Sequence, residues 1–182
     1  FRSVRDGKRL VYLDNASTTQ KPVQVIDAIS SFYRNTNANI HRAVYALAEE
    51  ATEAFESVRD SVASFAGIGD RREVVFVRGT TEAINLVAYS WGRQAVGEGD
   101  IIVTTEYEHH SNIVPWQLLA QERGAKVEFV GVDDSGRLKL EDLERFLATG
   151  RVKMVAFSLM SNVLGTISDA PRIISMAREA GA

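Results

Sequence analysis

Apolar residues recur at helical spacing in two stretches near the N-terminus. The first stretch follows Pro22, which suits the first turn of a helix, and the second ends at Gly67, a residue typical of a helix C-terminus. Residues 35–39, rich in Asn and Thr, indicate a loop between them. For the second stretch the pattern favours a single amphipathic helix packed on a domain over a coiled coil. The apolar positions are Val25, Ile26, Ile29, Phe32 and Tyr33, then Val44, Leu47, Ala51, Phe55, Val58, Val62 and Phe65.

Beyond Gly69 the pattern changes to short β-branched runs that alternate with helical ones. Strands alternating with helices indicate βαβ units, so we predict an α/β fold, a mainly parallel sheet with helices on both faces. A helical segment, residues 1–69, precedes it. The last helix ends at Gly181-Ala182, where such a chain would turn into its next strand, so we expect an incomplete domain. The predicted strands are residues 74–77, 101–105, 126–132 and 152–159, and the predicted helices 80–91, 112–123, 140–147 and 171–180.

The composition is that of a globular chain: of 182 residues, 45% are hydrophobic and 25% are charged. The net charge of −3 gives no reason to expect nucleic acid or an anionic membrane as a partner. Apolar runs are far shorter than the ~20 residues that span a bilayer, and no signal-peptide pattern is visible, so we expect a cytoplasmic protein. The absence of cysteine excludes a disulfide scaffold, a thiolate metal site and a catalytic thiol within these residues.

Candidate chemistry lies where predicted strands end, because ligands of open α/β sheets bind beyond the carboxyl ends of the strands. The nucleotide-binding and hydrolase patterns G-x-G-x-x-G, G-x-x-x-x-G-K-[ST] and G-x-S-x-G are absent. Residues 78–82, which read Arg-Gly-Thr-Thr-Glu, follow a strand and open a helix. The N-terminus of a helix attracts anions through its N–H groups and its partial positive charge. This segment is therefore either a phosphate cradle or a plain helix cap.

A pair of histidines follows the next predicted strand. His109 or His110 could stack on a flat ring, act as an acid or base, or be an ordinary surface residue. Adjacent histidines in an extended chain point to opposite sides, so we expect no joint metal site.

Three further polar segments are less specific. Asn162, just past the last predicted strand, could bind a ligand oxygen or simply form a turn. Residues 13–19 and 39–42 are small polar runs of the kind usually found in loops.

Five strings occur in a fixed order and together are more specific than any one alone. They read YLDNASTTQKP (residues 12–22), IHR (40–42), VRGTTEAINLV (77–87), EHHSNIVPW (108–116) and SNVLGT (161–166). In this order they resemble the group II cysteine desulfurases, the SufS/NifS-like class V aminotransferases, over residues 10–182. The string at residues 108–116 is the sharpest marker of this branch.

The resemblance implies a fold, a cofactor and a reaction. The fold is the large domain of fold type I of the transferases that depend on pyridoxal 5'-phosphate (PLP). Residues 70–182 would form the first part of that domain, and residues 1–69 would pack on the large and small domains. The family converts L-cysteine to L-alanine and an enzyme persulfide, which supplies a sulfur-acceptor protein for iron–sulfur cluster assembly. Its members are homodimers.

The resemblance also implies a role for individual residues. Thr80 and Thr81 would bind the phosphate of PLP, while His109 would stack on the pyridine ring and take part in catalysis by moving protons. Asn162 would contact both the cofactor and the substrate. The residues implied to border the substrate are Asn15, Ala16 and His41.

Several groups that the family reaction needs are missing from these residues. There is no Ser-Gly-His-Lys motif with the Schiff-base lysine, and no cysteine to carry the persulfide. The aspartate for the ring nitrogen and the arginine for the substrate carboxylate are also expected further along. We therefore expect the N-terminal part of such an enzyme, inactive alone. The alternatives are another class V PLP enzyme, similar to selenocysteine lyase, kynureninase or an epimerase, or a non-catalytic binding module.

Overall fold

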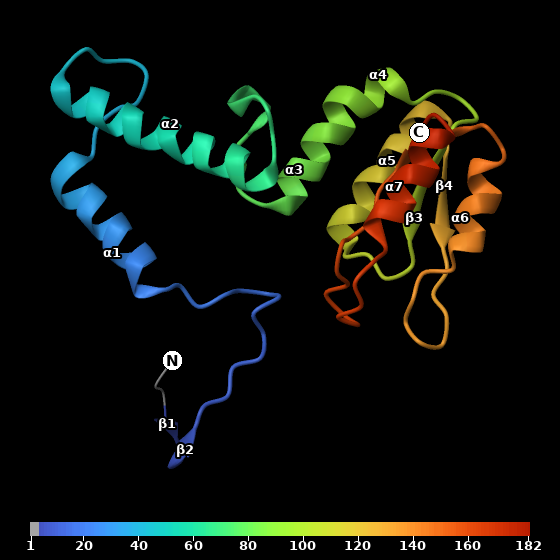
Figure 1. Cartoon of the computed structure of the whole chain (residues 1–182), viewed down its shortest axis with the longest axis horizontal. Helices are drawn as coiled ribbons and strands as arrows, with labels where there is room; N and C mark the ends of the chain where they lie inside the picture. Colours follow the sequence, from blue (N-terminus) through green and yellow to red (C-terminus); the bar gives the residue numbers. More distant parts are fainter. Residues whose placement is uncertain (1–3) are drawn as a thin grey trace. The chain divides into compact units, whose positions relative to one another are not determined.

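The computed structural model describes residues 4–182, and the chain folds into two compact units, the first ending at Phe76 and the second running from Val77 to Ala182 (Figure 1). The domain boundary predicted between residues 69 and 70, and the packing of residues 1–69 on two domains, stay predictions. The first unit contains strands β1 (Val4–Arg5) and β2 (Lys8–Arg9), helix α1 (Val23–Ser31), the π-helical turn η1 (Phe32–Thr36), helix α2 (Ala46–Ala66) and the 3-10 turn η2 (Arg71–Glu73).

The second unit alternates helices and strands. In chain order it contains α3 (Thr80–Val87), the π-helical turn η3 (Ala88–Gly92), α4 (Arg93–Ala95), β3 (Ile101–Thr105), the 3-10 turn η4 (His110–Asn112), α5 (Val114–Arg123), β4 (Lys126–Val130), α6 (Leu140–Leu147), β5 (Val152–Val155) and α7 (Ala170–Glu179).

Glycine ends α2 as its sequence predicts. Gly67 has a φ of 68°, the left-handed conformation that glycine adopts without the steric penalty of a Cβ. Its N–H and that of Ile68 donate to carbonyls of the last helical turn, which closes the helix. Two left-handed residues also form the turn between β1 and β2, since Asp6 and Gly7 have φ values of 51° and 72°.

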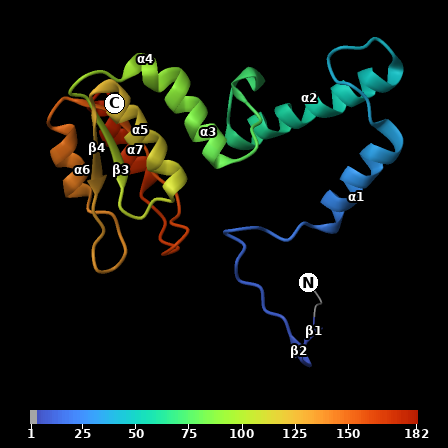
Figure 2. The same cartoon turned by 180° about the vertical axis from the view of Figure 1, so that it is seen from behind.

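Three parallel strands form the sheet of the second unit, in the order β4-β3-β5. Figure 2 shows β3 and β4 side by side. β3 is the central strand, and all five of its residues are buried. Successive side chains of a strand point to opposite faces, so β3 contributes to a core on each side of the sheet. One core joins Ile101 and Val103 to Leu143, Leu147 and Ile173 of α6 and α7, and the other joins Ile102 to Ala88, Val96, Trp116 and Leu119. Helices therefore cover both faces of a parallel sheet, which confirms the predicted α/β class.

One predicted strand is wrong. Residues 74–77 are irregular chain. The carbonyl of Val74 accepts a hydrogen bond from the guanidinium of Arg59, so it is not paired with a strand. The β-branched run is therefore held by a side chain of α2.

Two other strands end earlier than predicted, for a related reason. After β4, the N–H of Gly131 donates to the carboxylate of Asp142 at 3.1 Å. After β5, the N–H of Ser158 donates to the carboxylate of Glu108 at 2.7 Å. Side-chain acceptors thus take over from the sheet. The predicted loop at residues 35–39 also begins later, because η1 extends to Thr36.

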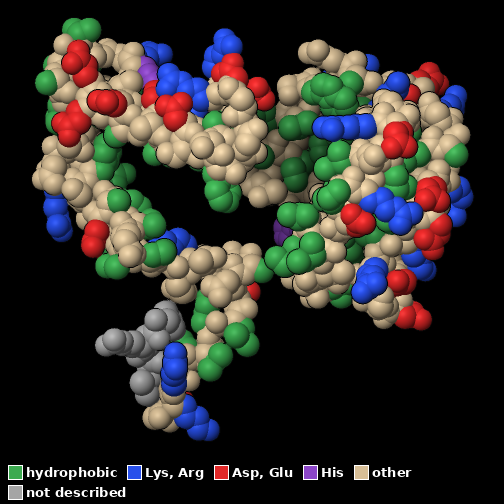
Figure 3. Space-filling view, viewed as in Figure 1, with side chains coloured by type: hydrophobic (Ala, Val, Ile, Leu, Met, Phe, Trp, Pro, Cys, Tyr) green, Lys and Arg blue, Asp and Glu red, His purple; other side chains and the backbone are tan. Residues whose placement is uncertain are grey.

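The surface of the second unit mixes charge and apolar groups. Figure 3 shows Lys and Arg side chains interspersed with Asp and Glu over this unit. Beside β5 and α7 lies a largely apolar pocket of about 310 Å³, lined by residues that include Met154, Phe157 and Ile173. Within residues 4–182, no helix combines the length and the apolar character needed to cross a membrane.

Candidate functional site

The first turn of α3 carries two exposed threonines, Thr80 and Thr81. Gly79 precedes them and offers no side chain to cap the first N–H groups of the helix, and a Cβ built on it would meet no atom within 4 Å. Within residues 4–182, neither threonine hydroxyl forms a hydrogen bond. The threonines therefore do not act as helix caps, and the open space, the hydroxyls and the N–H groups suit an anion.

Glu82 fixes the turn that enters α3. Its carboxylate accepts the backbone N–H of Arg78 at 2.7 Å and the guanidinium of the same residue at 3.1 Å. These contacts with Arg78, the side-chain one first, hold the pKa of the Glu82 carboxyl below its ordinary value. The ion pair is exposed, so water screens it and it contributes mainly to local geometry.

His109 lies just beyond β3 and precedes the turn η4. Its Nδ1 accepts the backbone N–H of Ser111 at 3.1 Å and lies 2.8 Å from the hydroxyl of the same residue. Because Nδ1 is an acceptor, the neutral ring carries its proton on Nε2, which has no hydrogen bond within residues 4–182. Turn η4 contacts α3, so the structure brings the histidine turn and the threonine-bearing helix side by side.

Asn162 lies in a turn that other residues build. The Oγ of Ser161 accepts the N–H of Leu164 at 3.1 Å, and Gly165 donates its N–H to the Ser161 carbonyl at 2.9 Å. The Asn162 side chain is exposed and forms no hydrogen bond within the described chain. The turn therefore does not depend on the Asn162 amide, which can bind a ligand.

Glu108, to which sequence reasoning assigned no role, links these segments. It is 8% exposed and accepts four hydrogen bonds. Its Oε1 accepts from the Thr105 hydroxyl at 2.8 Å and from the Ser158 N–H at 2.7 Å. Its Oε2 accepts from the Ser158 hydroxyl at 2.6 Å and from the Asn112 amide at 2.9 Å. The carboxylate thus joins the end of β3, the turn after His109 and the chain after β5.

A second set of bonds fastens the loop that carries Asn162. The hydroxyls of Tyr107 and Ser168 lie 2.5 Å apart, and the Ser168 hydroxyl donates to the carbonyl of Ser158 at 2.7 Å. The N–H of Ser168 donates to the carbonyl of Leu159 at 2.8 Å. The two ends of this loop are therefore tied to each other and to the chain that leads to His109.

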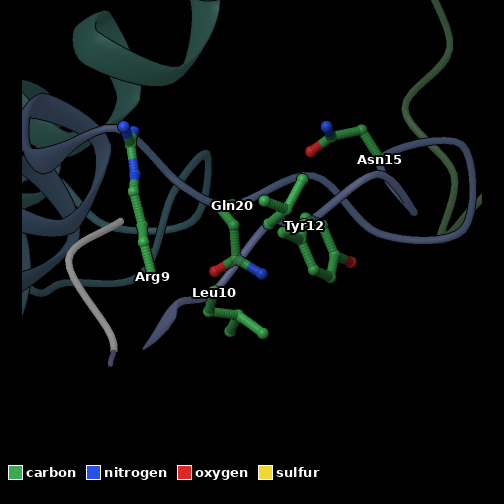
Figure 4. Close-up of a pocket in the computed structure, with 6 residues that line it drawn as sticks. Arg9, Leu10, Tyr12, Asn15 and Gln20 are labelled. Atoms are coloured by element: carbon green, nitrogen blue, oxygen red, sulfur yellow. The ribbon is translucent and has the colours of Figure 1, made fainter. Parts of the chain in front are cut away.

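Asn15 and Ala16 lie in an exposed turn of the first unit. The Tyr12 hydroxyl donates to the Thr18 carbonyl at 2.6 Å and so closes the turn. Asn15, Tyr12 and Gln20 contribute to a shallow pocket of about 400 Å³ (Figure 4). This pocket is made only of residues from the N-terminal segment.

His41 is held against α2. Its φ of 62° is uncommon for a residue with a side chain. Its N–H donates to the Thr52 hydroxyl at 3.1 Å, its Nε2 lies 3.2 Å from the Glu56 carboxylate, and its ring meets that of Phe55 edge-on at 5.9 Å. Asn15, Ala16 and His41 belong to the first unit and the other predicted site residues to the second, so their sharing of one site stays a prediction.

Residues 11–182 match the aminotransferase class-V family. The chain belongs to this family. A cysteine desulfurase of Synechococcus elongatus is 52% identical to it over 177 residues, which cover 97% of this chain and 28% of the relative. A cysteine desulfurase of an Enterobacter species is 49% identical over 97% of this chain and 43% of the relative. The chain therefore spans less than half the length of these relatives.

Solved structures of cysteine desulfurases share the fold of this class V chain. The apo structure of the enzyme from Thermococcus onnurineus superposes with a TM-score of 0.88 at 40% identity, covering 94% of this chain and 42% of that one. The structure of the cysteine desulfurase CsdA (S-sulfonic acid) from Escherichia coli gives a TM-score of 0.81 at 40% identity, covering 93% of this chain and 42% of that one. The predicted fold type I architecture agrees with these neighbours.

Membership of the class V aminotransferases implies PLP as the cofactor, and the residues present fit it. The free hydroxyls of Thr80 and Thr81, and the space that a Cβ at Gly79 would enter, suit a phosphate at a helix N-terminus. An imidazole on the adjoining turn suits a flat aromatic ring.

Proposed function

We propose that this chain supplies the phosphate- and ring-binding part of the PLP pocket in a cysteine desulfurase. The reaction converts L-cysteine to L-alanine and an enzyme persulfide for iron–sulfur cluster assembly. The observation that carries the proposal is the contact between α3, with the free hydroxyls of Thr80 and Thr81, and the turn that follows His109. Relatives named cysteine desulfurase at 49% and 52% identity support the choice of reaction.

Each residue of the second unit has a distinct task in the proposal. PLP, when bound, supplies an electron sink for the carbanion at the α-carbon of the substrate. Thr80 and Thr81 donate hydroxyl hydrogen bonds to its phosphate, which the N-terminus of α3 also attracts. His109 lies against the pyridine ring and gives or takes a proton at Nε2. Asn162 donates its amide to the cofactor or to the substrate carboxylate.

For the first unit, the proposal assigns Asn15, Ala16 and His41 to substrate binding. The persulfide cysteine and the Schiff-base lysine come from polypeptide outside these residues, since the sequence has no cysteine and no lysine in a Ser-Gly-His-Lys motif. The chain alone is therefore inactive. At its natural length the protein is a cytoplasmic homodimer that takes L-cysteine as substrate and passes sulfur to an acceptor protein.

The test compares PLP binding by the protein at its natural length with that of the double variant Thr80→Val, Thr81→Val. Valine keeps the shape and removes only the hydroxyls. A hydrogen bond to a charged group contributes about 1.5–3 kcal/mol, so the loss of two should weaken PLP binding by more than about a hundredfold. Release of L-alanine from L-cysteine measures the activity.

Thr149→Val is the matched control. The Thr149 hydroxyl donates to the Phe146 carbonyl at 2.6 Å, at the end of α6, and this variant should bind PLP like the wild type. The isolated chain mixed with PLP should show no lysine-dependent absorbance band. A natural-length protein that neither binds PLP nor releases L-alanine would refute the proposal.

A further inference from the structure

We propose that Glu108 is a positioning residue, which holds His109 and the loop bearing Asn162 at the same edge of the sheet through hydrogen bonds of fixed direction. The role in cofactor binding rests on the proposed function, whereas the hydrogen-bond pattern itself does not. Glu108 is 8% exposed and immediately precedes His109 in the chain, so the bonds of its carboxylate fix the backbone from which His109 projects.

The direction of the network begins at Trp116, which is 3% exposed. An indole N–H can only donate, and it donates to the Oδ1 of Asn112 at 2.9 Å. The Asn112 amide is thereby oriented with its Nδ2 toward Glu108, whose Oε2 accepts at 2.9 Å. An amide nitrogen also only donates, so residue 108 must present an acceptor at this point.

The other carboxylate oxygen faces the same requirement. The backbone N–H of Ser158, which can only donate, lies 2.7 Å from the Oε1 of Glu108. Each oxygen therefore faces one donor that cannot become an acceptor. A glutamine at position 108 would place its NH₂ group against Nδ2 of Asn112 in one orientation and against the Ser158 N–H in the other. Only a carboxylate satisfies both sides, although a glutamine has the same shape.

Two of the bonded segments adjoin the predicted cofactor contacts. Asn112 ends the turn η4, which contacts α3 and follows His109. Ser158 begins the loop that carries Asn162, and the carbonyl of Ser158 is in turn held by Ser168. The carboxylate of Glu108 therefore sets the spacing between the His109 ring and the Asn162 amide, and it does so without itself binding the cofactor or the substrate.

The first test is Glu108→Gln in the natural-length protein. Buried donors left against an NH₂ group should shift the loop, so we expect PLP binding to weaken by about tenfold or more and kcat to fall more than KM rises. The matched control is Glu106→Gln, because Glu106 lies on the same loop but is exposed. The control should match the wild type.

The decisive test is rescue by a second substitution. In the double variant Glu108→Gln, Asn112→Asp, the new aspartate accepts both the Trp116 N–H and the glutamine NH₂ group, and the glutamine oxygen accepts from Ser158. Each donor that cannot become an acceptor again has one, and the Ser158 hydroxyl, which donates to Oε2 of Glu108 in the wild type, can rotate to accept from the glutamine NH₂ group. The negative charge moves from position 108 to position 112. We expect PLP affinity and kcat to return to within about threefold of the wild type. A residue with only a general structural role would not be rescued by adding a second substitution.

A spectroscopic measurement tests the hydrogen-bond network independently of the proposed function. The sequence has two tryptophans, and Trp91 is 44% exposed whereas Trp116 is buried. The indole N–H signal of Trp116, assigned with Trp91→Phe, should exchange with solvent faster in Glu108→Gln and slowly again in the double variant. If the wild type binds no PLP but this pattern holds, the proposed function fails and the network stands. The inference would be overturned if Glu108→Gln bound PLP as tightly as the wild type. It would also be overturned if the double variant were not rescued, whether because it misfolds or because it binds PLP weakly.

Discussion

Truncation of Ile102 tests whether β3 is held by the core on its α5 side. Its side chain is 0% exposed and packs against Trp116 and Leu119, each 3% exposed. Replacing a buried isoleucine with alanine costs about 2–5 kcal/mol, and the cost depends on how far the neighbours collapse into the cavity. Trp116 is tethered by its hydrogen bond to Asn112, which hinders collapse. We therefore expect a loss in the upper half of this range, about 4 kcal/mol.

Urea unfolding followed by tryptophan fluorescence measures this loss. Both tryptophans, Trp91 and Trp116, lie in the second unit, so the signal reports on that unit. With a slope of about 2 kcal/mol per molar urea, a loss of about 4 kcal/mol lowers the midpoint by about 2 M. The matched control is Ile174→Ala, because Ile174 is 42% exposed and should cost about 1 kcal/mol or less. Equal losses from the two substitutions would refute the assignment of Ile102 to a packed core.

Two further predictions concern the turns that bound helices. Gly67→Ala should destabilise α2 by about 1 kcal/mol, because Gly67 has a φ of 68°. The control Gly69→Ala should cost less, since a Cβ at Gly69 meets no atom within 4 Å and its φ is not left-handed. Thermal unfolding followed by circular dichroism compares the two variants, and equal costs would contradict the capping role of Gly67. Glu82 has a lowered pKa in the folded chain, so its contact with Arg78 stabilises the fold above the ordinary glutamate range and is lost as pH falls through the lowered value. The thermal midpoint of the wild type should therefore exceed that of Glu82→Gln near neutral pH, and the two should converge in acid; a gap that widens on acidification would contradict this.

Patterns that depend on neighbours in the chain predicted the elements well. The strand at residues 101–105 and the helix at 140–147 have the predicted bounds, because period-two and helical apolar spacing report directly on the two faces of an element. The end of α2 was equally clear, since a single glycine decides it. The hairpin at Asp6-Gly7 also has a sequence signal, because an Asp-Gly pair favours a tight turn between two strands.

Interactions between residues far apart in the chain could not be predicted from the sequence. The run at residues 74–77 has strand composition, yet a guanidinium fifteen residues earlier binds its first carbonyl. The bonds from Ser158 to Glu108 span fifty residues, and no periodic pattern reports such a pairing. The candidate site was predicted from short motifs at the ends of strands, and it stays a prediction. Glu108 begins one of these motifs, yet nothing in the sequence indicates that its side chain bonds to Ser158.

The hydrogen bond from the backbone N–H of Ser111 to His109 leaves only one ring nitrogen of this imidazole available for reaction. With Nδ1 occupied, Nε2 is the nitrogen left to exchange protons or to be acylated by a histidine-selective reagent. The two possible amide mimics of histidine then differ, because the amide nitrogen of glutamine reaches the place of Nε2 while that of asparagine reaches the place of Nδ1. Glutamine at this position keeps a donor on the free side but cannot act as an acid or base, so it would separate the proposed ring-binding role of His109 from its proposed acid–base role.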